Sequence, residues 1–302
     1  MDKKTRIIEL KKQKNAVILA HYYVPDEVQE IADYIGDSFY LSKVAVDLEA
    51  DVVVFCGVSF MGESTKILNP EKTVIMPDET ADCPMAHMAA VDKIKQVRAQ
   101  YEDVAVVCYI NSTAELKVHA DVCVTSANAV KIVKELPNRN IFFIPDGNLG
   151  RYVAGQVPEK HFIFNDGFCP IHHHLTVEEV TAAKRRYPKA EFLAHPECQG
   201  DILALADYIG STSGIIEYAA ASDSKEFIIG TEKGVFYELK KRNPDKRFYP
   251  AGGHMICEDM KKITVDKVLN ALQEMDYQVD VSDEVSKGAK HSLNRMLELG
   301  NR

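Results

Sequence analysis

The stretch HPECQGDILALADYIGST at residues 195–212 indicates how the chain folds, because the same pattern of residues occurs twice earlier in the sequence. It aligns without a gap with HYYVPDEVQEIADYIGDS at 21–38 and with YINSTAELKVHADVCVTS at 109–126. The offsets are 88 residues, from 21 to 109, and 86 residues, from 109 to 195. Solenoid repeats have shorter periods of roughly 20–50 residues. The pattern therefore predicts three small domains of one design.

Each repeat alternates short apolar runs with helical segments. In the first repeat, strands are expected at 16–20, 34–36, 51–57 and 73–77, and helices at 26–33, 38–50 and 61–68. Such alternation is typical of a parallel sheet covered by helices on both faces. We therefore expect an α/β protein made of three αβα sandwich domains related by a pseudo-three-fold axis. Each domain should hold a small parallel sheet of about four strands, and the active site should lie at the three-domain interface.

The domain boundaries are expected to follow the repeat. The expected units are residues 1–88, including an N-terminal helix, residues 89–175, residues 176–263, and a C-terminal helical arm at 264–302. The last part of this arm, from about residue 276, has no counterpart in the repeat.

Composition limits the classes of function. The chain has 302 residues with a net charge of −9, which argues against a nucleic-acid or anionic membrane partner because either would need a basic surface. Its apolar runs are far shorter than the roughly 20 residues that span a bilayer, and its N-terminus lacks the pattern of a signal peptide. The seven cysteines contain no Cys-x-x-Cys pair, which favours a reducing, cytoplasmic location.

A second alignment near the end of each repeat singles out three cysteines. The aligned segments are NPEKTVIMPDETADC at 69–83, VPEKHFIFNDGFC at 157–169 and NPDKRFYPAGGHMIC at 243–257, which end in Cys83, Cys169 and Cys257. Three thiolates that converge on one axis are soft ligands, suited to zinc, copper(I) or an iron-sulfur cluster. A structural zinc site normally takes four ligands, whereas an iron-sulfur cluster held by three cysteines keeps one iron open. The remaining cysteines have no equivalents and are expected in the core: Cys56, Cys108, Cys123 and Cys198.

Polar side chains follow the first strand of each repeat. The first residues after these strands are His21, Tyr109 and His195, and the residues two positions further on are Tyr23, Asn111 and Glu197. Ligands of parallel sheets bind beyond the carboxyl ends of the strands, and alternate residues of an extended segment face the same side. We therefore expect all six side chains around one cavity, with the carboxylate Glu197 as the candidate general base.

Three hydroxyl residues are expected at the N-terminal ends of helices: Ser38, Ser126 and Thr212. A hydroxyl in this place can cap the free backbone amides of the helix. Alternatively, three helix N-termini aimed at one cavity would bind an anion. The triple histidine at 172–174 also raises the question of a metal site, although His173 and His174 fit a solvated helix start better.

Taken together, these residues resemble the quinolinate synthase (NadA) family, in a short form. The resemblance covers nearly the whole chain, and its specific parts are AHYY at 20–23, CYINS at 108–112, TSAN at 125–128, FCPIH at 168–172, HPEC at 195–198 and GSTSG at 210–214. It implies condensation of iminosuccinate (iminoaspartate) with dihydroxyacetone phosphate to give quinolinate, phosphate and water in NAD biosynthesis. It also implies functional coupling to L-aspartate oxidase.

The resemblance further implies a role for each site residue. Cys83, Cys169 and Cys257 would hold a 4Fe-4S cluster whose open iron acts as a Lewis acid. The implied catalytic residues are Glu197, Tyr23, His21, His195 and Tyr109. The implied substrate-binding residues are His21, Ser38, Tyr109, Asn111, Ser126, His172, His195, Glu197, Ser211 and Thr212, with His172 guarding the approach. Longer members carry a Cys-x-x-Cys pair around the third ligand, whereas this chain reads HMICEDMK, so no regulatory disulfide is expected.

Two other classes of function are compatible with the residues alone. The histidines of the 172–174 run and the His195-x-Glu197 pair fit a zinc-dependent lyase or hydrolase. A non-catalytic protein that binds a dicarboxylate at its helix N-termini is the third class, and it would be indifferent to loss of the three equivalent cysteines. Metal analysis after aerobic and anaerobic purification distinguishes the iron-sulfur enzyme from the zinc-dependent lyase or hydrolase.

Overall fold

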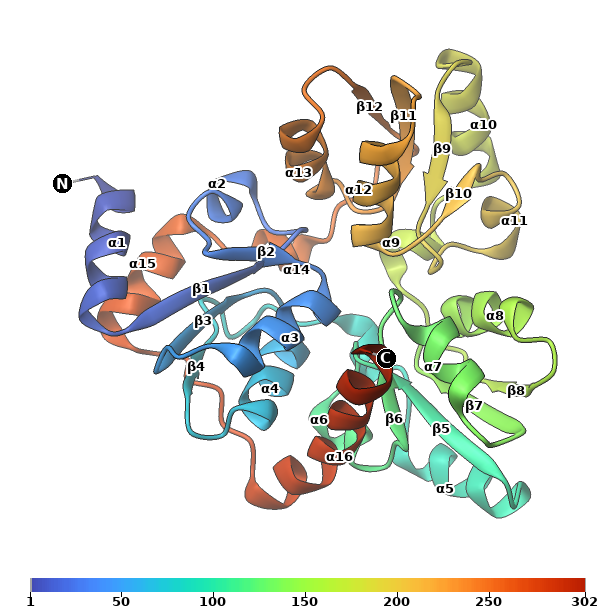
Figure 1. The fold of residues 1–302 in the computed structure, drawn as a ribbon, viewed down its shortest axis with the longest axis horizontal. Helices are drawn as coiled ribbons and strands as arrows, with labels where there is room; N and C mark the ends of the chain where they lie inside the picture. The colour runs from blue at the N-terminus through green and yellow to red at the C-terminus, as the bar shows by residue number, and fades with distance from the viewer. Residues whose placement is uncertain (1, 302) are drawn as a thin grey trace.

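The computed structural model describes residues 2–301, so Met1 and Arg302 lie outside the described residues. Three α/β units lie around a common centre (Figure 1). Each unit holds one four-stranded sheet in which all neighbouring strands are parallel. The predicted fold class is confirmed.

The three sheets share one strand order. They run β2-β1-β3-β4, β6-β5-β7-β8 and β10-β9-β11-β12. The first contains β1 (Ala16–His21), β2 (Tyr34–Gly36), β3 (Val52–Cys56) and β4 (Thr73–Ile75). The second contains β5 (Val104–Tyr109), β6 (Val122–Val124), β7 (Asn140–Ile144) and β8 (His161–Phe164). The third contains β9 (Glu191–Ala194), β10 (Tyr208–Ile209), β11 (Glu226–Gly230) and β12 (Arg247–Pro250).

Helices connect the strands in the same way in each unit. The first unit has α1 (Lys3–Gln13), α2 (Asp26–Gln29), α3 (Ser38–Asp47), α4 (Ser59–Leu68) and the short 3-10 helix η1 (Pro84–His87). The second has α5 (Val91–Gln100), α6 (Ala114–Val118), α7 (Ala129–Glu135), α8 (Gly147–Gln156) and α9 (Pro170–His173). The third has α10 (Val177–Arg186), α11 (Gly200–Leu203), α12 (Thr212–Ala221), α13 (Val235–Arg242) and α14 (Glu258–Lys261).

The C-terminal segment returns to the first two units. Helix α15 (Val265–Glu274) packs against α1 and β3, and helix α16 (Asp283–Asn301) packs mainly against α6 and β6 (Figure 1). The buried side chains of α16 join the hydrophobic core that the first two units share. We propose boundaries near residues 88 and 175 for the three units, with this segment bridging the first and second. None of the helices within residues 2–301 has both the length and the apolar character to span a bilayer.

The repeated Ala-Asp pair explains how each second strand is joined to the first. The carboxylates of Asp33, Asp121 and Asp207 accept the backbone N–H of Ile18, Val106 and Phe192 at 2.8, 2.7 and 2.7 Å. The N–H groups of the same aspartates donate to the carbonyls of the same three residues at 2.9, 3.0 and 2.8 Å. Each aspartate therefore satisfies both backbone groups of one residue in the first strand, as buried polar groups require.

The lysine shared by NPEK, VPEK and NPDK has a structural role as well. Lys72, Lys160 and Lys246 each donate to carbonyls at the C-terminal end of α3, α7 or α12. These carbonyls lack partners within the helix, and a cation is favoured at this end of the helix dipole. The three units therefore share hydrogen bonds from side chains to the backbone as well as a hydrophobic pattern.

The aspartate contacts give a stability prediction. We expect Asp121→Ala to lower the free energy of unfolding by about 1–3 kcal/mol, because it leaves the buried N–H of Val106 without an acceptor. Asp92→Ala is the matched control, since Asp92 forms an ion pair with Lys95 while its side chain is 89% exposed. That change should cost less than about 0.5 kcal/mol. Urea denaturation of the metal-free protein measures both, and equal midpoints would contradict the assignment.

Candidate active site

The three units meet at a buried cavity. Its lining contains nearly all of the side chains expected from the sequence: His21, Tyr23, Ser38, Tyr109, Asn111, Ser126, His172, His195, Glu197, Thr212 and the cysteines Cys83, Cys169 and Cys257. The carboxyl ends of β1, β5 and β9 therefore face one space, as parallel sheets require of a shared site. Ser211 is the exception. It lies in the adjoining pocket, where its hydroxyl accepts the N–H of Gly214 as the cap of α12.

The three cysteines reach the cavity by the same route. Each one immediately precedes a short helix, as the N-cap residue of η1, α9 or α14. In each repeat the carbonyl two residues before the cysteine accepts a backbone N–H from the segment after the third strand, from Ser59 to Ala81, Gly147 to Gly167 and Lys233 to Met255. The cysteine loops therefore have equivalent anchors in all three units.

Backbone N–H groups face the three sulfurs. Those of Met85 and Ala86 face Cys83, that of His172 faces Cys169, and those of Asp259 and Met260 face Cys257. Burial raises the pKa of all three thiols, to about 11 for Cys257. Thiols in this setting need a positive ion to ionise, and the N–H groups would then stabilise the thiolates.

The other four cysteines lie in the core, as expected. Cys56, Cys108, Cys123 and Cys198 are fully buried free thiols outside the cavity lining. Burial raises the pKa of Cys56 and Cys198, which fits inert core thiols.

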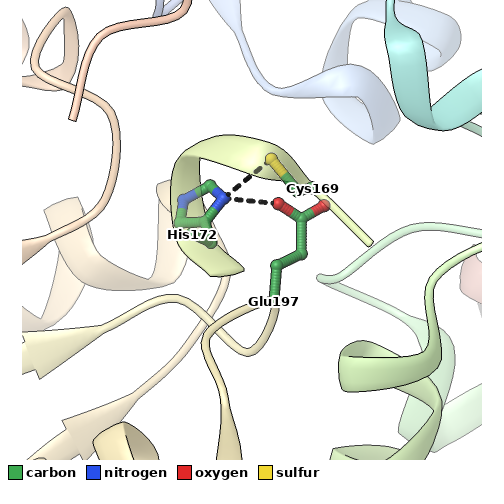
Figure 2. A group of neighbouring side chains, drawn as sticks. All are labelled: Cys169, His172 and Glu197. Atoms are coloured by element: carbon green, nitrogen blue, oxygen red, sulfur yellow. Dashed lines mark hydrogen bonds and ion pairs between the residues drawn. The ribbon is translucent and has the colours of Figure 1, made fainter. Parts of the chain in front are cut away.

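Glu197 is the centre of the polar network. Its carboxylate lies 2.7 Å from Nδ1 of His172 and 3.5 Å from Nδ1 of His195. Figure 2 shows that His172 Nδ1 points at both Glu197 and Cys169, whose sulfur is 3.2 Å away. Burial alone would raise the pKa of Glu197, but the two histidines and the Tyr109 hydroxyl offset this and hold the pKa at about 2. The carboxylate is therefore ionised at neutral pH.

Tyr23 is linked to Glu197 through a residue that the sequence pattern did not indicate. The Tyr23 hydroxyl lies 2.8 Å from Oγ1 of Thr212 and 2.8 Å from Oγ1 of Thr231. Thr231 lies in turn 2.9 Å from Nε2 of His172. Burial and the nearby Glu197 raise the pKa of Tyr23 well above its usual value, so the phenol is protonated. A continuous chain of hydrogen bonds therefore joins Tyr23, Thr231, His172 and Glu197.

Comparison of the repeats did not indicate Thr231, because the other two repeats have no hydroxyl at the equivalent position. Thr231 follows β11, and the equivalent positions after β7 and β3 are Pro145 and Gly57, which carry no hydroxyl. Its position directly after the third strand could have indicated a site residue, because the third strand of each sheet ends at the same edge as the first strand.

His21 and His195 share one local conformation. Their Nδ1 atoms accept the backbone N–H two residues further on, from Tyr23 at 3.2 Å and from Glu197 at 3.3 Å. Burial lowers the pKa of both rings to about 3, so both are neutral at physiological pH. Since Nδ1 is the acceptor, Nε2 carries the hydrogen, and that of His195 lies 3.2 Å from the Ser126 hydroxyl. These rings can donate hydrogen bonds but are not cations.

The expectation for the helix starts needs correction. Helix α3 begins at Ser38, but its cap is the carboxylate of Asp37, which accepts the N–H of Tyr40. Helix α12 begins at Thr212 and is capped by Ser211. Ser126 lies three residues before α7, in a turn that the Asn128 side chain closes. The hydroxyls of Ser38, Ser126 and Thr212 are therefore not caps, and Asp37 opposes an anion at the start of α3.

Two further site features bear on ligands. Asn111 Oδ1 is buried in the cavity lining and has no hydrogen-bond partner among residues 2–301, so it offers an acceptor to a bound molecule. His172 is 1% exposed and lies in the cavity wall. Within the described chain, one group of three potential ligand atoms lies within 4.8 Å of one another: Cys169, His172 and Glu197.

The fold and the site define a class: an α/β enzyme of three repeats with three cysteine thiols and a buried network of polar side chains at the junction. A family model described as quinolinate synthetase A protein matches residues 5–298. The chain belongs to the quinolinate synthase family, and its resemblance to that family is confirmed.

Relatives match over their full length. Quinolinate synthase of Clostridioides difficile (strain 630) is 53% identical over 97% of each chain. That of Fusobacterium nucleatum subsp. nucleatum is 54% identical over 98% of this chain and 99% of its own. Quinolinate synthase 2 of Methanosarcina acetivorans is 47% identical over 97% of this chain and 94% of its own. A solved FpvC mutant from Pseudomonas aeruginosa overlaps with a TM-score of 0.17 at 13% identity, which is too low to inform the fold.

Proposed function

We propose that this enzyme, a quinolinate synthase of NAD biosynthesis, condenses iminosuccinate with dihydroxyacetone phosphate in the central cavity, with a 4Fe-4S cluster on Cys83, Cys169 and Cys257. The observation that supports this most is the convergence of three equivalent free cysteines, one from each repeat, on the cavity that also contains Tyr23 and Glu197. Family membership favours this function over a zinc hydrolase or a non-catalytic binding protein.

The donor set fits an iron-sulfur cluster. Thiolates on a single zinc ion, at about 2.3 Å from the metal, would lie roughly 3.8 Å apart. Within residues 2–301 the thiols of Cys83 and Cys257 do not join Cys169 in a group of that size. In a cluster the three thiolates bind different iron atoms and can lie further apart. Backbone N–H groups that face the sulfurs would then affect the reduction potential of the cluster. When bound, it would supply an open iron that polarises a substrate hydroxyl or carboxylate as a Lewis acid.

The chain's own residues would orient the substrates and move protons. The neutral Nε2–H groups of His21 and His195 are donors suited to carboxylate oxygens. We propose that Ser38, Tyr109, Asn111, Ser126 and Thr212 complete the binding surface, with Ser211 acting indirectly as the cap of α12. Thr212, the first residue of α12, lines the cavity, and the dipole of the helix favours an anion at this end.

Tyr23 and Glu197 are the proposed acid and base. The protonated Tyr23 phenol can give a proton to a departing hydroxyl, and the ionised Glu197 can receive one from a carbon next to a carbonyl or imine. The contacts with His195 and His172 lower the pKa of Glu197 and make it a weak base in the resting site, so we propose that it acts as base after losing one of them. His172 is the partner to be displaced, since it makes the shorter contact at 2.7 Å.

Thr231 provides a prediction within this network. Thr231→Val keeps the shape of the side chain but removes the hydroxyl between Tyr23 and His172. We expect kcat to fall about 10- to 100-fold while KM changes less than threefold, in the range typical of residues that orient a functional group. Thr231→Ser should restore most of the activity. Steady-state kinetics of the reconstituted enzyme measures this, and a valine variant with wild-type kcat would refute the role.

The proposed partners and location follow from this chemistry. Iminosuccinate is unstable in water, which supports functional coupling to the enzyme that makes it, L-aspartate oxidase. A reducing cytoplasm would keep the three cysteines available to a cluster.

An anaerobic assay tests the proposed function. The purified protein, reconstituted with iron and sulfide, should form quinolinate and phosphate from iminosuccinate and dihydroxyacetone phosphate. A fully reconstituted wild type that forms neither product would contradict the proposal, and quinolinate formation by a zinc-loaded protein without iron would contradict the role of the cluster.

A further inference from the structure

A buried carboxylate in the cavity wall accepts a hydrogen bond from the backbone of the third cysteine loop. Glu232 follows β11 next to Thr231, and its side chain has no exposed surface. Its Oε1 atom accepts the backbone N–H of Cys257 at 3.1 Å and lies 2.9 Å from Nζ of Lys261, while Oε2 accepts the N–H of Gly234. One side chain therefore holds the backbone of a cysteine and the ammonium of a lysine.

Lys261 carries this connection into another domain. It belongs to α14, directly after Cys257, and its second hydrogen bond goes to the backbone carbonyl of Tyr23 in the first repeat. The pair Glu232–Lys261 thus connects the third repeat to the first. It joins the backbone of Cys257 to the loop that contains Tyr23. Because both charges are largely withdrawn from water, their mutual position is specified by hydrogen bonds.

The backbone at this junction is packed too closely for a side chain. A Cβ atom at Gly234 would lie 2.6 Å from the Tyr22 carbonyl oxygen and 2.7 Å from the Tyr23 Cα. The buried amide of Gln29 donates to the carbonyls of Tyr22, Val24 and Gly234 at 2.9, 3.0 and 3.1 Å. The Tyr23 loop is therefore held against the segment after β11 from two sides.

A carboxylate lies next to the cysteine backbone in all three repeats, but only in the third repeat does it also pair with a lysine. Asp146, at the position equivalent to Glu232, caps α8 and faces the backbone N–H of Cys169 without completing a hydrogen bond. In the first repeat the equivalent residue is Val58, and Asp82 accepts the N–H of Cys83 at 2.8 Å instead. In the third repeat the carboxylate also engages Lys261, which makes the contact to Tyr23.

We infer that Glu232 and Lys261 are positioning residues that couple the Cys257 loop to the Tyr23 loop, so that cluster binding and the placement of the Tyr23 hydroxyl depend on one another. This inference rests on the proposed cluster. It predicts that a change at the pair will alter two properties together: how firmly the cluster is held and how fast the reaction proceeds.

The test compares holoenzymes reconstituted anaerobically: wild type, Glu232→Gln, Lys261→Met, the double variant, and Lys262→Met as a control. Lys262 is the neighbour of Lys261 but pairs with Asp259 and the Thr80 carbonyl on a partly exposed surface. Three quantities are measured: the rate of iron release to a ferrous chelator, the electron paramagnetic resonance spectrum of the reduced cluster, and kcat. Supporting residues behind metal ligands typically contribute roughly 10- to 100-fold to metal affinity or activity.

We expect Glu232→Gln and Lys261→Met each to release iron about tenfold faster, to change the spectrum and to lower kcat about tenfold. The double variant should be no worse than Glu232→Gln by more than about twofold, because both changes remove the same bridge. Lys261→Arg should retain most activity, and Lys262→Met should match wild type. Should Glu232→Gln not fold, Lys261→Met carries the test. Wild-type iron release, spectrum and kcat in Lys261→Met would overturn the inference, whereas a wild type without a cluster would refute the proposed function instead.

Discussion

Replacing Cys169 with alanine is expected to give a folded protein that holds no cluster and forms quinolinate more than about 100-fold more slowly. Even residues behind a metal ligand contribute roughly 10- to 100-fold, so loss of a ligand should exceed that range. The thiolate-to-iron charge-transfer absorbance measures loss of the cluster, and the quinolinate assay measures loss of activity in the same sample.

Cys198→Ala is the matched control for this change. Cys198 is fully buried and lies in the core of the third repeat, outside the cavity lining. Its removal should lower stability by about 1 kcal/mol through the lost packing and leave cluster and activity in place. Equal loss of the cluster in both variants would show that the repeat does not identify the ligands.

Glu197→Gln is expected to lower kcat by about 10²- to 10⁴-fold, the contribution typical of a general base. The amide keeps the size of the side chain but removes the charge that faces His172 and His195. Because the variant still accepts a hydrogen bond from His172, KM should change much less than kcat. Steady-state kinetics at saturating dihydroxyacetone phosphate measures the difference.

Glu178→Gln, on the exposed face of α10, controls for the loss of one negative charge. It should have wild-type kinetics. A Glu197→Gln variant that keeps kcat within threefold of wild type while it still holds the cluster would remove Glu197 from the catalytic set.

The sequence alone predicted the fold and most of the cavity, because the repeat is visible without gaps and each repeat delivers equivalent residues to one place. Three cysteines at equivalent positions could be separated from four that have no equivalents. The same comparison placed His21, Tyr109 and His195 at one edge, and all three line the cavity.

Features that depend on differences between repeats could not be predicted in this way. Thr231 is aligned with a glycine and a proline, and Glu232 with Asp146 and a valine, so neither forms an obvious set. Their roles depend on contacts with His172 and Lys261 across loops that no local pattern specifies.

The sequence also does not predict helix N-caps to within one residue. Asp37 and Ser38 are both good N-cap residues, and the sequence cannot say which oxygen reaches the free amides first. The structure selects Asp37, whose second oxygen also accepts the Ser213 hydroxyl at 2.6 Å. The packing of α15 against α1 was likewise not predicted, because the contact joins segments from opposite ends of the chain.

The most direct measurement is the iron and sulfide content per chain of the anaerobically reconstituted wild type and of the three single variants Cys83→Ala, Cys169→Ala and Cys257→Ala. We predict about four irons and four sulfides per wild-type chain and loss of nearly all of both in each variant. A wild type that binds a single zinc ion and no sulfide, or a Cys83→Ala or Cys257→Ala variant that keeps the full complement, would contradict a cluster shared by the three repeats.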